Sequence, residues 1–301
     1  MLLLLVALQA TQNPGHTVLA AARRAVAQLN DTAAARAAGY RPITEIGVPD
    51  GLPFQGEHWQ LPFRDTLPDV SLERPSFIMF GPVNGGLRRV GVAYSALIAL
   101  EAPAPNGLGG DPTAKWHDHF WCDNAPGRPN GFLVNERDQC TSQGGVLNPH
   151  RVSMVHVWTD IESPEGRYGH DNPALPFVAL GLTPPTVPEY RDHERARAVR
   201  KLSFALGEVY DARLPLTRRI EQENQNPALA DSLRRRRSAI VALVPELKRA
   251  ERDRAAYDRV ATRVMAEWDG MLALYEQMAS PELKPRVKRR HEAVIAVSAH
   301  H

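Results

Sequence analysis

Proline and glycine are distributed unevenly along this 301-residue chain, and their distribution limits the folds that it can adopt. Twenty of the 25 prolines and 19 of the 21 glycines precede Glu189. Both residues disfavour helix interiors, so the first part is expected to consist of short elements and turns, and the remainder of long helices. The sequence therefore predicts an α+β fold, with an α+β domain at 17–187 and a helical, coiled-coil-like domain at 188–301.

Charge differs between the two parts in the same way. The first 188 residues carry 13 Lys and Arg against 17 Asp and Glu, whereas residues 189–301 carry 23 against 17, a net charge of +6. This excess is modest for a domain whose affinity rests on phosphate contacts, so no nucleic-acid partner is expected. The basic runs Arg234–Arg237 and Lys288–Arg290 are interpreted as solvated helix faces. Peripheral contact with anionic lipid, or with an acidic protein, fits the charge better.

The first ten residues form an apolar run that ends at the small residue Ala10. Such a run resembles the apolar region and cleavage site of a signal peptide, although no basic residue precedes it. We expect residues 1–16 to be a signal peptide or a membrane anchor; the alternative is a short buried helix. The expected location is the periplasm, either free or anchored to the membrane.

The two cysteines, Cys122 and Cys140, flank a Pro- and Gly-rich segment and lie 18 positions apart. A disulfide between them would close a loop of little apolar content and contribute about 3 kcal/mol. The alternative is a pair of free thiols in a reducing compartment. The oxidation state of these cysteines therefore bears on location as well as on structure.

The first part contains two predicted helices and several predicted strands. Residues 17–29 and 31–38 favour helices, and Gly39 supplies a stop. The β-prone runs 75–80 and 87–97 are joined by a segment with Asn84-Gly85-Gly86, which is typical of an antiparallel hairpin. We expect an antiparallel sheet or a partial barrel, with the N-terminal helix packed on it.

The stretch Trp116–Cys122 contains two histidines, His117 and His119, separated by one residue. In a strand these two side chains share one face, while Asp118 and Cys122 point to the other. Residues 154–159 predict a second strand with His156 on one face. We expect His117, His119 and His156 to meet and to bind Zn or Cu, with His58 as a fourth ligand.

Other side chains near these histidines are candidates for supporting roles. Glu57 or Asp118 would orient an imidazole, and Met154 would be either a soft axial ligand for copper or a core residue. An open position on the metal would lower the pKa of a bound water, or bind oxygen species at copper. The alternative is that the histidines line a polar groove. Catalysis stays open, because neither a Ser-His-Asp order nor a His-Glu-x-x-His helix is present.

Several of these motifs occur together: Gly56-x-His58-Trp59, Trp116-His117-x-His119, and His156-Val157-Trp158 followed by Pro164-x-Gly166 and Asn172-Pro173. In this combination the chain resembles a family of uncharacterised exported microbial proteins that includes lipoproteins. The resemblance covers roughly residues 17–177 and implies export and a single domain, but no established activity. The charged C-terminal part departs from the usual layout of that family.

The helical part carries the strongest periodic signal in the chain. Apolar residues follow steps of three and four from Ile240 to Met278, interrupted only at Arg254, and predict one helix of about 58 Å. We expect the helix at 198–214 to fold back on it, and shorter helices at 216–225 and 287–297. Helices 198–278 would mediate self-association or bind a protein partner. The alternative function is therefore a non-catalytic structural or docking subunit of a periplasmic or membrane-bound complex.

Overall fold

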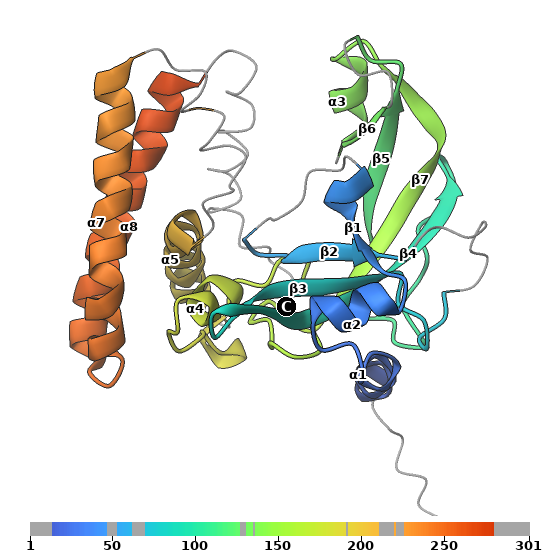
Figure 1. The fold of residues 1–301 in the computed structure, drawn as a ribbon, viewed down its shortest axis with the longest axis horizontal. Coiled ribbons are helices and arrows are strands. Elements are labelled where there is room, and N and C mark those ends of the chain that lie inside the picture. Colours follow the sequence, from blue (N-terminus) through green and yellow to red (C-terminus); the bar gives the residue numbers. More distant parts are fainter. Residues whose placement is uncertain are drawn as a thin grey trace, which may run out of the picture.

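The structure is a computed structural model that describes residues 14–46, 53–61, 70–126, 131–134, 136–190, 192–210, 220 and 226–279. It confirms the predicted α+β fold. Two short N-terminal helices precede a seven-stranded antiparallel sheet that curls into a half-barrel, and C-terminal helices pack together beside it (Figure 1). Residues 1–13, which hold most of the predicted signal peptide or anchor, lie outside the described residues.

The sheet has the strand order β1-β2-β3-β4-β7-β5-β6, and every neighbouring pair is antiparallel. The predicted hairpin is confirmed, with Asn84 and Gly85 at φ 51° and 79° forming a tight left-handed turn. The strands are β1 (Arg41–Pro42), β2 (Glu57–Gln60), β3 (Phe77–Val83), β4 (Gly86–Ala99), β5 (His117–Asp123), β6 (Phe132–Val134) and β7 (Val146–Val157).

Helices α1 (Pro14–Ala25) and α2 (Thr32–Ala37) pack on one face of the sheet, as predicted. The Asp31 side chain begins α2 by accepting a hydrogen bond from the backbone N–H of Ala34 at 2.9 Å. Gly39, at φ 97°, follows the end of the helix. Apolar residues of α1, of the turn that follows it and of the sheet form one buried cluster that includes Val18, Ala22, Val26, Ile78, Phe80, Val92 and Val155.

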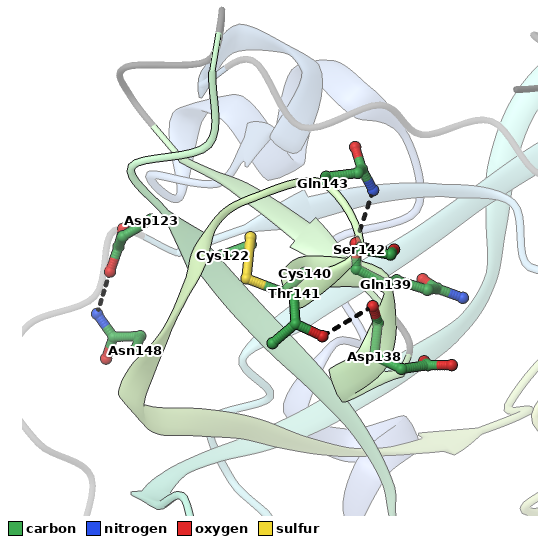
Figure 2. The surroundings of a disulfide bond; sticks show 9 residues. All are labelled: Cys122, Asp123, Asp138, Gln139, Cys140, Thr141, Ser142, Gln143 and Asn148. Carbon is green, nitrogen blue, oxygen red and sulfur yellow. Dashed lines mark hydrogen bonds between the residues drawn. A yellow bond between two sulfur atoms is a disulfide. The ribbon is translucent and has the colours of Figure 1, made fainter.

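The predicted disulfide joins Cys122 of β5 to Cys140 of the short helix α3 (Arg137–Thr141), as Figure 2 shows. Both cysteines are fully buried, beside Phe120 and Val134. Gly145 packs against them: a Cβ atom there would lie 2.3 Å from Sγ of Cys122. The disulfide is consistent with an oxidising, exported location. In the part of the chain that the structure describes, no helix has the length and apolarity needed to cross a membrane.

The predicted helical bundle is confirmed, but the single long helix over Ile240–Met278 is wrong. The chain turns after Ala250, and the Asp253 side chain starts a new helix by accepting a hydrogen bond from the N–H of Ala256 at 3.0 Å. The interruption of the apolar pattern at Arg254 marks this turn. The helices are α4 (Leu175–Ala179), α5 (His193–Tyr210), α7 (Pro227–Ala250) and α8 (Arg254–Met278), with 3₁₀ turns at Ile43–Ile46 and Val187–Tyr190.

Helices α7 and α8 lie side by side as a hairpin, and α5 packs against both (Figure 1). Apolar residues of the predicted seam are buried between the helices, among them Ile240, Leu243, Leu247, Val264, Trp268, Met271 and Tyr275. Phe54 and Phe177 from the first part of the chain belong to the same cluster. The helical part therefore shares its core with segments that flank the sheet. The helices predicted at 216–225 and 287–297, and the basic run Lys288–Arg290, lie outside the described residues, apart from Ile220.

Candidate functional site

One face of the sheet carries all four histidines that the sequence singled out. His117 of β5 lies opposite Met154 of β7, and His156 lies two residues further along β7. His58 of β2 lies opposite Met79, which in turn lies opposite Gly91 of β4. Because residues directly opposite each other in a sheet point to the same side, the register places these histidines on a common face.

Curvature of the sheet brings histidines from distant strands together. Strands β2 and β7 are separated by β3 and β4, so in a flat sheet their backbones would lie about 14 Å apart. Yet the two Nε2 atoms of His58 and His156 are only 3.5 Å apart. Of the two strands between them, β4 presents the small residues Gly91 and Ala93 on this face, and the end of the Met79 side chain from β3 packs over Gly91. The half-barrel therefore closes over the histidine face.

His117 lies at the centre of the cluster. Its ring centroid is 4.9 Å from that of His156, 5.0 Å from that of His119 and 4.3 Å from that of His170. The prediction that imidazoles from separate strands converge is thus confirmed for the rings of 117, 119 and 156.

His170 is a member of the cluster that the sequence analysis missed. It lies in the turns after β7, where no strand or helix periodicity indicates which way a side chain points, and the sequence Gly169-His170-Asp171 was the only signal. Its side chain is 47% exposed, in contrast with the buried His58 and His156. His170 therefore forms the outer side of the cluster.

Hydrogen bonds define how His156 is oriented. Its Nδ1 lies 2.7 Å from the backbone oxygen of His170, and since a carbonyl only accepts, Nδ1 must carry the proton. The Nε2 atom, which faces Nε2 of His58, is then unprotonated in the neutral ring. Nε2 of His117 is buried and has no hydrogen-bond partner among the described residues. The cluster therefore contains one buried imidazole nitrogen, Nε2 of His117, that the described contacts leave unpaired.

Burial and mutual repulsion keep the inner histidines neutral. Desolvation, together with the neighbouring imidazoles, holds the pKa of both His117 and His156 far below the ordinary value. At His170 desolvation works in the same direction, but the adjacent Asp171 carboxylate outweighs it and raises the pKa. The Oδ1 atom of Asp171 lies 3.3 Å from Nδ1 of His170. Burial thus favours the neutral, metal-binding form of His117 and His156, while Asp171 favours the charged form of His170.

The predicted supporting residues make contacts of other kinds. Glu57 accepts a hydrogen bond from Nε1 of Trp59 at 2.9 Å. Asp118 points away from the histidine face, as expected from the strand alternation, and forms an ion pair with Arg151 at 2.9 Å. Met154 is buried on the histidine face in an apolar cluster with Phe77 and Trp158. The observed surroundings of Met154 are those of a core residue.

Taken as they stand, the side chains do not form a finished metal site. Within the described ranges, no three His, Cys, Asp or Glu side chains are arranged so that they could hold one metal ion. Among the histidines, His58 and His156 bring their Nε2 atoms to 3.5 Å, and the His117 ring lies beside the His156 ring.

Comparison of the chain with family models, with curated proteins and with solved structures finds no match. The resemblance to exported microbial proteins therefore stays a prediction, and function has to be inferred from the residues themselves.

Proposed function

We propose that this chain is an exported metal-binding protein that holds Zn or Cu with His58, His117 and His156. The observation that carries the proposal is the group of imidazoles on one face of the sheet, with His58 and His156 buried and with a buried Nε2 atom of His117 that has no hydrogen-bond partner among the described residues. Buried polar atoms in proteins are nearly always paired, so an orphan nitrogen beside further imidazoles favours a ligand there.

The spacing of His58 and His156 suits two ligands of one ion. With Zn–N bonds of about 2.0–2.1 Å and tetrahedral angles, two nitrogen ligands lie about 3.4 Å apart. Their Nε2 atoms are separated by 3.5 Å. As a hydrogen bond between the two rings, this distance is at the weak limit. The carbonyl that accepts from Nδ1 of His156 is the usual second partner of a metal-bound histidine.

His117 would supply the third nitrogen after a change in ring orientation. Its ring centroid is 4.9 Å from that of His156, and we infer that rotation about its side-chain bonds would bring a nitrogen to the shared ion. His119, on the same face of β5, is the candidate for a fourth ligand. When bound by three imidazoles with an open position, such an ion supplies Lewis-acid chemistry and lowers the pKa of water. Catalysis is not part of the proposal.

The test is metal content and affinity. Protein prepared without an affinity tag, after removal of metal and titration with Zn²⁺ or Cu²⁺, is expected to bind about one ion, measured by elemental analysis and calorimetry. His156→Ala and His117→Ala are each expected to weaken binding, because each removes a ligand from a three-ligand site.

His150→Ala is the matched control, since His150 is exposed on the same strand as His156. This variant is expected to bind like the wild type. Equal and negligible metal in wild type, His117→Ala and His156→Ala would refute the proposal. Equal binding by all four proteins would place the metal elsewhere and refute it too.

The alternative, a docking subunit that uses its helical part, has less support. The apolar seam that was expected to bind a partner is buried between α5, α7 and α8 of the same chain. A partner would have to bind the charged outer faces of the hairpin, where Arg234 and Arg254 already pair with acidic residues one turn away. Self-association and peripheral membrane contact stay predictions.

A further inference from the structure

Helix α5 reaches the histidine cluster through Arg200. This arginine is 8% exposed and lies between two acidic side chains of the segment that follows β7. Its Nη1 donates to Oε1 of Glu165, and its Nη2 lies 3.2 Å from Oδ2 of Asp171. A guanidinium between two carboxylates fixes the relative position of both, because its donors have a rigid planar geometry.

Asp171 connects Arg200 to the histidines through its second carboxylate oxygen. Its other oxygen, Oδ1, accepts from Nε2 of Gln55 at 3.1 Å and lies 3.3 Å from Nδ1 of His170. The backbone oxygen of His170 in turn accepts from Nδ1 of His156 at 2.7 Å. A continuous path of polar contacts thus runs from α5 to the centre of the site.

A second contact ties the same segment to α5. Ser203, one turn after Arg200, donates through Oγ to the backbone oxygen of Pro173 at 2.7 Å. The segment from Glu165 to Pro173 is therefore held at both ends by one face of α5, and the His170 carbonyl lies between these two attachment points.

We propose that Arg200 is a positioning residue of the histidine site. It holds the His170 carbonyl oxygen where this oxygen accepts a hydrogen bond from Nδ1 of His156. His156 is thereby kept in the tautomer whose Nε2 is unprotonated. Without the guanidinium, the carboxylates of Glu165 and Asp171 would lose their shared counterion in a buried setting and separate. The His170 carbonyl would then move from His156 Nδ1. The metal-related part of this inference rests on the proposed function, whereas the tautomer part does not.

The first experiment measures the tautomer in metal-free protein. Two-bond ¹H–¹⁵N correlation spectra report which ring nitrogen of a neutral histidine is protonated, and His156→Gln assigns the signal. Wild type is expected to show the proton on Nδ1 of His156, and Arg200→Ala is expected to show a mixture of tautomers. If Arg200 only stabilised the packing of α5 against this segment, Arg200→Ala would lower the free energy of unfolding without changing the tautomer ratio of His156.

Arg263→Ala is the control, because Arg263 also forms an ion pair with a glutamate, Glu246, at 2.7 Å but on the exposed surface of the hairpin. It is expected to leave the His156 spectrum unchanged. If Arg200→Ala does not fold, as judged by circular dichroism, Arg200→Gln takes its place, since glutamine also removes the shared counterion but fills more of the space. An unchanged Nδ1 proton in the folded variant, or an Nε2 proton in wild type, overturns the proposal.

The second experiment measures affinity for Zn²⁺ alone. The variant at Arg200 is expected to bind about 10- to 100-fold more weakly than wild type, as is typical when the partner of a metal-bound histidine is lost. Unchanged affinity would overturn the metal-related part. Wild type that binds no Zn²⁺ or Cu²⁺ would refute the proposed function instead, and the tautomer result would still decide the role of Arg200.

Discussion

The disulfide offers the most direct quantitative prediction. It closes a loop between residues 18 positions apart, and constraining an unfolded chain by a loop of that length stabilises the folded state by about 3 kcal/mol. In a domain of this size, such a change lowers the melting temperature by about 6–12 °C. We therefore expect wild type treated with a reductant under denaturing conditions, and then refolded, to melt about that much lower than untreated protein.

The double variant Cys122→Ala/Cys140→Ala separates the cross-link from the reductant itself. It is expected to melt at least as low as reduced wild type, because it also loses two buried sulfur atoms, and to be insensitive to reductant. Melting is followed by scanning calorimetry, and thiols are counted by mass spectrometry after alkylation. Identical melting of oxidised and reduced wild type, or two free thiols in protein recovered from an oxidising compartment, would refute the reasoning.

Three further predictions concern packing and pH. Gly145→Ala should hinder formation of the disulfide, since its Cβ would lie 2.3 Å from Sγ of Cys122, and alkylation after oxidative refolding should detect free thiols. Burial works to raise the pKa of Asp160, but the hydrogen bonds from Arg89 outweigh it and hold the pKa below its ordinary value. In urea unfolding, the free energy of unfolding of the wild type should therefore exceed that of Asp160→Asn at pH 6, and this difference should shrink as the pH falls below about 4. Trp268→Ala should lower the free energy of unfolding by about 3–5 kcal/mol, because the ring is fully buried in the helical core; a loss below 1 kcal/mol would contradict this packing.

Strand periodicity was sufficient to predict which histidines share a face. A residue separation of two in an extended chain places His117 and His119 on one side whatever the rest of the fold does, and the same rule placed Asp118 on the other. His170 obeys no such rule, because its position depends on turns and on the contact between Asp171 and a helix some 30 residues later. Turn geometry of that kind cannot be read from local spacing.

The helical part shows a different limit of sequence patterns. Heptad spacing predicted correctly that residues such as Leu247 and Trp268 would be buried, but two helices that fold back on each other present the same spacing as one long helix. The distinguishing feature was the capping residue Asp253 next to the break at Arg254. Residues 251–253 form the turn that reverses the chain, whereas the apolar pattern extends from Ile240 to Met278 and does not depend on that turn.

The curvature of the sheet has a consequence for the order in which the protein acquires its properties. His58 and His156 are 98 residues apart along the chain, and their rings meet only because every intervening strand is paired and bent. Closing a loop of that length costs more chain entropy than forming a local hairpin, so we expect this contact to form after the hairpins. We therefore expect an incompletely folded chain to contain the hairpin and the helices but not the imidazole cluster. Metal binding by the cluster would then require the completely folded protein.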